Sequence, residues 1–442
     1  MESLASPEPF RAEEVSALKS ESPRWGLSKR MLFRFGFAYL VLYLLPFPLS
    51  AFYFLFGAGI RGYDSLWHAV VPWVGKRLFQ VDATVLPNGS GDTTYNYVQV
   101  FCFLVLAALA ALVWTLLDRR RAHYARLYEW LRVYVRFGLA AAMISYGAVK
   151  IIKSQFPDPS MDRLLQPFGD SSPMGLLWTF MGASVSYNVF TGLGEMLGGL
   201  LLTARRTTLL GALVSLGVLA NVVMLNFSYD VPVKLYSSHL LAMALFLTLP
   251  DLRRLADFFL FHRSVKRDEV RPLFQRKGLH RGALILRVLF VAGVAMVSFA
   301  DAWRNYQWYA GRAQSSPLYG VWEVDEFEAD GQTRPALVTD TTRWRRVIFD
   351  YPGMLAIQSM DDDRQRYFVE LNAADKTIAL VKRDDPGWKT SIFYERPAPA
   401  LLTMRAKFDG RQIHARLHRI ENPEFLLTSR GFHWINEYPF SR

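Results

Sequence analysis

The chain of 442 residues contains a single cysteine, Cys102. One cysteine excludes intrachain disulfides, thiolate metal clusters and any Cys-x-x-Cys redox pair. Because Cys102 lies within an apolar run, it is predicted to be a small packing residue. The sequence also lacks a nucleotide-binding glycine-rich loop, a ligand set for haem or iron–sulfur clusters, and a nucleophile triad. We therefore expect any redox cofactor to be bound noncovalently, and we predict no metal site.

The overall composition, with 51% hydrophobic and 20% charged residues, is too apolar for an ordinary soluble protein and too charged for a chain buried in a membrane throughout. Residues 301–442 carry 20 basic and 20 acidic side chains, so the net charge of +12 belongs to residues 1–300. Those basic residues lie beside apolar runs, as juxtamembrane charges do. The pattern favours membrane lipids over nucleic acid as partners.

Apolar runs near the roughly 20 residues that cross a bilayer recur along residues 31–303. They predict an α-helical integral membrane bundle with seven spans, at 35–55, 97–117, 131–151, 186–202, 207–227, 235–249 and 284–303. The sixth span is short, which allows it to tilt, re-enter or pack inside the bundle. Residues 61–85, between the first two spans, are partly amphipathic and suit a position along the membrane interface.

Basic residues predict the orientation of the bundle. Arginines follow the second, fourth and sixth spans, so those loops, including the basic loop 251–282, are expected to be cytoplasmic. The N-terminal tail, residues 1–30, falls on the same side, and an odd number of spans then places the C-terminal part outside the cytoplasm. Because the polar lead precedes a full-length span, we expect an uncleaved anchor and a multi-pass protein of the cell membrane. Attraction to anionic headgroups explains the basic loop, with partner docking as the alternative.

The C-terminal part has a different periodicity. After a linker at 304–316, residues 317–442 contain short alternating runs separated by turn signals such as Asp330-Gly331 and Asp409-Gly410. Eight or nine antiparallel strands at this spacing predict a meander that closes into an all-β barrel. The last predicted strand is EFLLTSRGF. His414 and His418 would lie about 13 Å apart on a strand and are predicted to be surface residues.

Two features at the ends of this region carry a family resemblance. Gly320 and Trp322 stand in a Gly-x-Trp relation in the first strand, and Arg430 lies in the last predicted strand. These ends resemble a lipocalin-like barrel. The resemblance implies that Trp322 plugs the barrel floor and that Arg430 lies across it. A generic barrel with an aromatic plug is the alternative.

The membrane region carries a second resemblance, over residues 130–255. The run YGAVKIIKSQFPDPSMDRLLQPFGD places a lysine at the end of one span, and NVFTGLGEMLGGLLLTARRTTLLGALVSLGVLANVVMLN supplies a Gly-x-x-Glu helix rich in glycine and leucine. This pattern resembles the DoxX family of small helical-bundle membrane proteins and falls here on Lys150, Gly192 and Glu195. The family includes subunits of thiosulfate:quinone oxidoreductase, so the resemblance implies a quinone-linked redox role.

The segment from Tyr146 to Lys153 also resembles the membrane domain of vitamin K-dependent carboxylases. In that family a lysine acts as a base in quinone-epoxidation chemistry. This chain departs from those enzymes, because two isoleucines separate Lys150 from Lys153 and the C-terminal domain is much shorter. The departure puts carboxylase activity in doubt and leaves a membrane lysine facing a hydrophobic ring as the shared hypothesis.

Ionisable side chains at membrane depth are candidates for function. Lys150 and Glu195 are the predicted catalytic residues, because glycines around Glu195 allow neighbouring helices to approach while the carboxylate faces the bundle interior. A hydrogen bond or a buried ion pair between helices that stabilises the fold is the alternative role. The candidate substrate-binding residues are Tyr146, Tyr187, Asn188, Asn226, Asp230, Lys234 and His239. The last four are expected to converge in a polar mouth over the bundle, and the two tyrosines to donate to a quinone carbonyl. For the tyrosines the alternative is interfacial anchoring, for Asp230 and Lys234 loop solvation or a surface pair, and for His239 an interhelical hydrogen bond.

Three functions therefore compete. The first is a quinone-linked oxidoreductase or a subunit of one, with a noncovalently bound quinone as its cofactor. The second is a protein that binds or transports a lipophilic small molecule without chemistry. The third is an assembly subunit that acts with a membrane or periplasmic partner protein.

Overall fold

A computed structural model describes residues 24–265, 276–313, 316–351, 353–421 and 424–441. Most of the predicted tail, and part of the basic loop 251–282, lie outside the described residues. The chain divides into two compact units. The first contains Met1–Ala141, Leu201–Leu219 and Pro232–Arg271, and the second contains Ala142–Leu200, Ala220–Val231 and Pro272–Arg442. The second unit joins helical segments to the C-terminal strands, so the division does not follow the predicted boundary at residue 303.

The chain up to Ala313 is helical. Its helices are α2 (Leu27–Leu44), α3 (Tyr53–Val74), α4 (Thr94–Leu117), α5 (Ala125–Ile151), α6 (Met161–Leu165), α7 (Pro173–Ala183), α8 (Val185–Thr203), α9 (Thr208–Ser228), α10 (Lys234–Thr248), α11 (Leu252–Phe259) and α12 (Lys277–Ala313). Short 3-10 or π turns are η1 (Leu49–Phe52), η2 (Gly75–Phe79), η3 (Phe168–Asp170), η4 (Arg205–Thr207) and η5 (Leu249–Asp251). Because α12 continues to Ala313, most of the segment 304–316, predicted as a linker, is helical.

Five helical segments in the described part of the chain are long and apolar enough to cross a membrane. They are Leu27–Phe79, Thr94–Leu117, Arg205–Ser228, Lys234–Phe259 and Lys277–Trp308. Six of the seven predicted spans each overlap one long helix, and the first overlaps α2 and α3; of these helices, α5 and α8 do not meet the combined requirement of length and apolarity. A bundle with several candidate spans is therefore confirmed, and the number seven stays a prediction.

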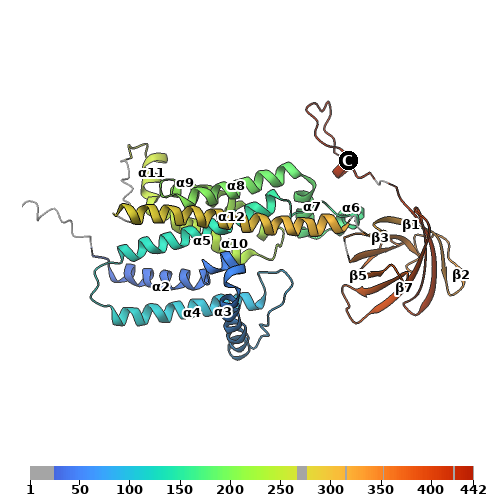
Figure 1. The fold of residues 1–442 in the computed structure, drawn as a ribbon, viewed down its shortest axis with the longest axis horizontal. Coiled ribbons are helices and arrows are strands. Elements are labelled where there is room, and N and C mark those ends of the chain that lie inside the picture. Colours follow the sequence, from blue (N-terminus) through green and yellow to red (C-terminus); the bar gives the residue numbers. More distant parts are fainter. Residues whose placement is uncertain (1–23, 266–275, 314–315, 352, 422–423, 442) are drawn as a thin grey trace, which may run out of the picture. The chain divides into compact units, whose positions relative to one another are not determined.

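The first predicted span, 35–55, is not one helix. The helix α2 ends at Leu44, and the chain turns through Pro46 and Pro48 before α3 begins at Tyr53. Proline has no backbone N–H and clashes with the preceding turn, which explains why the helix cannot continue. In Figure 1, α3 runs at a steep angle to α2 and α4. This arrangement is compatible with the interfacial position expected for residues 61–85.

The packing between α2 and α4 includes a buried arginine. Arg34 is 1% exposed and donates to the hydroxyls of Tyr124 and Thr115 and to the carbonyl of Asp118. Tyr124 in turn donates to the Asp118 carboxylate at 2.9 Å. Cys102 is buried in the neighbouring apolar cluster of α3 and α4, as its predicted packing role requires.

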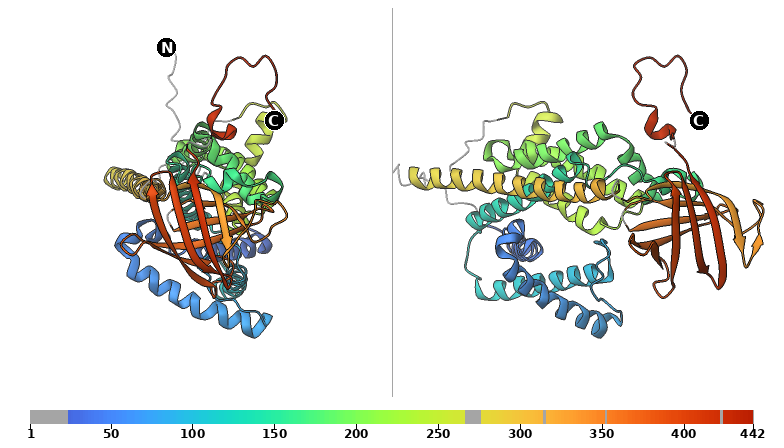
Figure 2. Two further views of the ribbon diagram at one scale, coloured as in Figure 1. Left: turned by 90° about the vertical axis from the view of Figure 1, so that its right-hand side faces the viewer. Right: turned by 45° about the vertical axis from the view of Figure 1, so that its right-hand side comes forward.

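The C-terminal part forms a closed eight-stranded antiparallel barrel (Figure 1 and Figure 2). Its strands are β1 (Gly320–Ala329), β3 (Trp344–Phe349), β4 (Met354–Ser359), β5 (Arg364–Asn372), β6 (Thr377–Lys382), β7 (Lys389–Ala398), β8 (Leu401–Phe408) and β9 (Arg411–Arg419). The two-residue strand β2 (Gln332–Thr333) pairs with the end of β1. Consecutive strands pair along the sheet, and pairing of β1 with β9 closes it. The predicted meander is thus confirmed.

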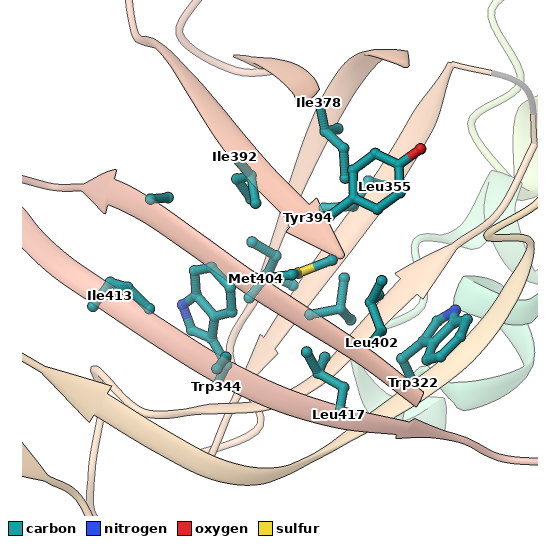
Figure 3. Close-up of a cluster of buried hydrophobic side chains, with 14 of the residues drawn as sticks. Trp322, Trp344, Leu355, Ile378, Ile392, Tyr394, Leu402, Met404, Ile413 and Leu417 are labelled. Carbon is teal, nitrogen blue, oxygen red and sulfur yellow. The ribbon is translucent and has the colours of Figure 1, made fainter. Parts of the chain in front are cut away.

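The inside of the barrel is an apolar core. Alternate residues of each strand point inward, and Figure 3 shows Trp322, Trp344, Met404 and their neighbours filling the interior. The side chains of this cluster are each at most 8% exposed. Alternation of period two places one face of every strand inside, which is why the sequence pattern anticipated the barrel. His414 and His418 lie on the outward face of β9, partly exposed, as predicted.

The last predicted strand and the predicted role of Arg430 are wrong. Residues Leu426–Ser429 form a short helix, α13, and Arg430 lies against Phe440, 3.8 Å from the ring centroid. The β1–β9 pairing explains the difference, because a closed barrel leaves no edge to which a further strand could pair. The cation near Trp322 is Arg396 of β7, at 5.9 Å from the ring.

The Gly-x-Trp relation has a clear steric reason. Gly320 has φ of +130°, and a Cβ added there would lie 3.0 Å from Nε of Arg419. Trp322 is fully buried and donates from Nε1 to the carbonyl of Leu318 at 2.8 Å. Trp322 therefore belongs to the buried core of the barrel, and its plug role stays a prediction.

Candidate functional site

The centre of the candidate site is an ion pair between α5 and α8, within the second unit. Lys150 donates through Nζ to Oε1 of Glu195, and the two residues are 6% and 3% exposed. The second carboxylate oxygen, Oε2, is buried and has no hydrogen-bond partner among the described residues. Transferring charges out of water is costly unless they pair, so this pairing explains how both groups tolerate burial. The two predicted catalytic residues are brought together.

Two glycines make this contact possible. A Cβ added at Gly147 would lie 2.8 Å from the carbonyl oxygen of Gly192 and 2.9 Å from the backbone nitrogen of Met196. A Cβ added at Gly192 would lie 2.9 Å from the carbonyl oxygen of Gly147 and from Cβ of Lys150. The helices therefore touch backbone to backbone, as small residues allow in membrane bundles. Each charged residue follows its glycine by three positions, so Gly147-x-x-Lys150 mirrors Gly192-x-x-Glu195.

A polar segment follows α5 directly, in the connector between α5 and α7 (residues 152–172). Lys153 is buried, adopts φ of +61° and pairs with Asp158. Asn188 of α8, which is fully buried, donates through Nδ2 to the carbonyls of Phe156 and Met181 at 3.3 and 3.0 Å. The connector is thus tied to the same helix that carries Glu195. The Lys153–Asp158 pair was missed by sequence reasoning, although a lysine five residues before an aspartate was a usable signal.

The other predicted binding residues divide between the two units. Tyr146 is partly buried and precedes the glycine contact of α5, whereas the ring of Tyr187 is exposed and lies against Phe180 and Phe190. Asn226 is buried near the end of α9, and Asp230 has φ of +50° in the turn that follows. These four residues belong to the second unit.

Lys234 and His239 belong to the first unit. The carboxylate of Asp92 accepts from the backbone nitrogens of Lys234 and Leu235 at 2.8 and 2.9 Å, so it caps the start of α10. His239 stacks on Tyr43 with ring centroids 4.0 Å apart. Its Nε2 forms a hydrogen bond with the hydroxyl of Tyr39, and its Nδ1 forms one with the carbonyl of Leu235. A carbonyl can only accept, so Nδ1 carries the proton and Nε2 accepts from Tyr39. This geometry matches the interhelical role named as the alternative for His239.

The connector is also held by the barrel. The carboxylate of Asp162, on α6, accepts from Nη1 of Arg364 at 3.0 Å and from Nε of Arg366 at 2.7 Å. Arg364 also donates to the carbonyls of Asp162 and Leu165. The hydroxyl of Tyr351 donates to the carbonyl of Asp158 at 2.7 Å. We call these contacts the barrel clamp. Because Asp158 also binds Lys153, the clamp extends to three residues beyond Lys150.

An apolar contact supports the clamp. Met161 and Leu165 of α6 pack on Val321, Ile348 and Ala356 of the outer barrel face. Outward-facing apolar residues on three adjacent strands were visible in the sequence, but only their cover by α6 explains them.

The buried carboxylate of Asp350 makes the stability of the barrel clamp depend on pH. It is 7% exposed, accepts from the backbone nitrogen of Asp162 at 3.1 Å, and leaves Oδ1 without a partner among the described residues. Burial raises the pKa of Asp350 above its usual value, while bonds from Ser160, Asp162 and Met161 oppose the shift. A raised pKa means that the folded protein holds this proton more readily than the unfolded chain. The stability contributed by Asp350 is therefore fully present below the usual aspartate pKa and is lost as pH rises through the raised pKa.

We expect Asp350→Asn to weaken this pH dependence, because the amide is an uncharged isostere. Melting of the detergent-solubilised full chain, followed by tryptophan fluorescence between pH 4 and 8, measures the effect. The wild type should lose melting temperature across this range more steeply than the variant. Asp384→Asn, at an exposed turn, tests whether removal of any surface carboxylate has the same result. Parallel profiles for wild type and Asp350→Asn would contradict the assignment.

Together, the apolar helices, the glycine-packed Lys–Glu pair and the barrel define a helical protein with several candidate membrane spans and a C-terminal β-barrel. Over 126 residues, 28% of this chain and 79% of the relative, the sequence is 32% identical to the uncharacterized protein YwoB of Bacillus subtilis (strain 168). The chain belongs to the same family as that protein. No protein-family model and no solved structure matches the chain.

Proposed function

We propose that this chain is a multi-pass membrane protein in which the Lys150–Glu195 pair binds a quinone-class molecule in a redox role. The observation that carries the proposal is the incompletely bonded, buried ion pair at the glycine contact of α5 and α8. A structural ion pair benefits from full hydrogen bonding, because each unsatisfied buried acceptor costs about 1–3 kcal/mol. An open acceptor beside a buried lysine is more typical of a ligand site.

The residues present fit a quinone head group. Lys150 has three N–H donors, of which one is directed to Glu195 Oε1, so N–H groups remain for a ring oxygen. Glu195 Oε2 is available to hold or release a proton at the same place. A bound quinone would supply the electron-accepting chemistry that no side chain in this sequence provides. The likeness to DoxX proteins in residues 130–255 and the lysine shared with the carboxylase membrane domain support the same assignment.

The proposed arrangement has seven spans, with α5 and α8 packed inside the bundle. Lys150 and Glu195 then face the bundle interior rather than lipid, as charged residues within membrane helices do. The basic loops then lie in the cytoplasm and the barrel lies outside it. Membrane lipids are the expected surroundings of the exposed apolar faces.

The test is mass spectrometry of organic extracts from the detergent-purified protein. We expect a quinone in stoichiometric amount from the wild type, and its loss from the Glu195→Gln and Lys150→Met variants, because each removes one half of the pair. Variants are compared at equal monodispersity on size-exclusion chromatography.

Glu129→Gln is the matched control. Glu129 also lies on α5, but it is partly exposed and pairs with Arg132 and Arg205. It should retain the quinone. Absence of quinone from the wild type, or equal retention in all variants, would refute this placement and favour another lipophilic ligand carried without chemistry.

A specific observation also favours the assembly-subunit function. Four large side chains of the C-terminal segment, Phe432, Trp434, Ile435 and Tyr438, are each at least 77% exposed. Exposed apolar clusters of this kind often bind a partner. Loss of a co-purifying membrane or periplasmic protein on Trp434→Ala would support this second function. The filled barrel core, by contrast, argues against a ligand inside the barrel.

A further inference from the structure

A group of arginines lies in the first unit, where α5 meets the turn η4 and the start of α9. Nη2 of Arg205 lies 3.5 Å from Oε2 of Glu129. Further along α5, Nη1 of Arg136 donates to Oγ1 of Thr208 at 3.2 Å. Glu129, Arg132 and Arg136 are spaced three and four residues apart, so they share one face of the helix. Arg132 therefore lies between the two contacts. We call Arg132, Arg136 and Arg205 the arginine face.

Arg132 has an N–H group that no described residue uses. Its buried Nε has no hydrogen-bond partner among the described residues, and its Nη1 lies 3.7 Å from Oε1 of Glu129. A buried donor without a partner destabilises a folded protein, so each one calls for an explanation. The side chain is 24% exposed and is therefore accessible to a ligand. The fork of a guanidinium matches the oxygens of a phosphate group, which would satisfy this donor.

The sequence around the arginine face has few acidic residues. Residues 130–157 and 196–229 contain no Asp or Glu, although they contain four arginines, Arg132, Arg136, Arg205 and Arg206. Arg132 and Arg205 approach the same carboxylate, that of Glu129. The N-terminus of α9 adds partial positive charge at the same place. Together these groups favour an anion over a neutral ligand.

Two features favour a lipid headgroup over a dissolved anion. The helical segment Arg205–Ser228 is a candidate membrane span, and Arg205 and Arg206 lie at its end. Trp130 of α5 and Leu210 of α9, close in sequence to the arginines, are 43% and 54% exposed. Exposed tryptophan and basic residues at the end of an apolar helix are typical of the depth at which lipid phosphates lie.

We propose that the arginine face binds the phosphate of an anionic lipid headgroup, with Arg132 as the central donor and Arg136 and Arg205 on either side. Basic pockets between membrane helices are one form of lipid-binding site. This site is distinct from the basic loop 251–282, because its side chains are held by contacts between helices. It lies in the first unit, whereas Lys150 and Glu195 belong to the second, so it goes beyond the proposed quinone role.

Native mass spectrometry of the full chain, purified in a neutral detergent, measures lipid binding directly. The probes are phosphatidylglycerol and phosphatidylcholine with the same oleoyl chains. Both contain a phosphate, but choline adds a positive charge that the arginines repel. We expect the wild type to bind phosphatidylglycerol about tenfold more tightly than phosphatidylcholine.

Arg132→Gln removes the central charge and its fork, so phosphatidylglycerol should bind about tenfold more weakly. Arg132→Lys keeps the charge but replaces the planar fork by a point charge, so its affinity should lie between those of the wild type and Arg132→Gln. Arg121→Gln is the matched control. Arg121 lies in the basic segment after α4, is exposed, and approaches Asp118 at 3.8 Å. Loss of this exposed, screened charge should leave the affinity within about twofold of the wild type. All variants are compared at equal monodispersity.

Three results would overturn the proposal. The first is equal affinity of the wild type for the two lipids. The second is an affinity for phosphatidylglycerol that Arg132→Gln weakens no more than Arg121→Gln does, because general surface charge would then explain the binding. The third is displacement of phosphatidylglycerol by an equal concentration of inorganic phosphate, which would assign the site to a dissolved anion. A preference for phosphatidylglycerol that Arg132→Gln removes and Arg121→Gln retains supports the lipid site.

Discussion

Lys150→Met is expected to destabilise the protein by about 3–5 kcal/mol, the cost typical of removing one partner of a buried ion pair. Methionine has a similar length and no charge, so the loss arises from leaving Glu195 without its counter-charge in the α5–α8 contact. Unfolding in mixed micelles with increasing sodium dodecyl sulfate, followed by tryptophan fluorescence, measures the change.

The double variant Lys150→Met/Glu195→Gln should recover most of this loss, because no buried charge remains. Arg205→Met is the matched comparison, since it breaks an exposed pair with Glu129 of the same helix and should cost less than about 1 kcal/mol. Equal costs for Lys150→Met and Arg205→Met would show that the buried pair is not the origin of the effect.

The second large effect is expected from Gly147→Ala. The added methyl group would meet backbone atoms of Gly192 and Met196 at 2.8 and 2.9 Å, and backbone atoms cannot swing aside as a flexible side chain can. The helices must separate, so we expect a loss of about 1–3 kcal/mol from overpacking. Because separation also lengthens the Lys150–Glu195 contact, the bound ligand should be lost with it.

Gly217→Ala is a stringent control for this prediction. Gly217 lies within α9, and nothing lies within 4 Å of a Cβ added there. Alanine favours helix over glycine by roughly 0.8–1 kcal/mol, so this variant should be as stable as the wild type or more stable. If Gly147→Ala behaved in the same way, the backbone contact between α5 and α8 would be disproved. The same unfolding assay serves for both variants.

The connector, residues 152–172, links the end of α5 that carries Lys150 to the barrel. Lys150 is the penultimate residue of α5, and within a few residues the chain is bound by Asn188 and then by Arg364 and Arg366 of the barrel. Side-chain contacts thus run continuously from β5 to the helix end that carries Lys150. The pH dependence assigned to Asp350 acts on the same contacts.

Periodicity was the reliable guide to the fold. Apolar runs of helix length anticipated α4, α9, α10 and α12, and alternation of period two anticipated the barrel strands up to β9. The same reasoning failed for EFLLTSRGF, because an alternating run forms a strand only if a sheet edge is available to it. It failed again at residues 45–48, where the mean apolar character of 35–55 concealed two prolines that end the helix.

The sequence by itself determined which residues had to be buried and which elements they would form, since helix and strand periods are local properties of the chain. It also marked Lys150 and Glu195, because ionisable groups in apolar helices stand out individually. Only the tertiary structure decided their partners. The pairing of Lys150 with Glu195, the binding of Asp162 by Arg364 and Arg366, and the cation supplied to Trp322 by Arg396 rather than Arg430 join residues 45 to 204 positions apart along the chain. Such contacts depend on how the helices and strands pack in space, which local sequence does not specify.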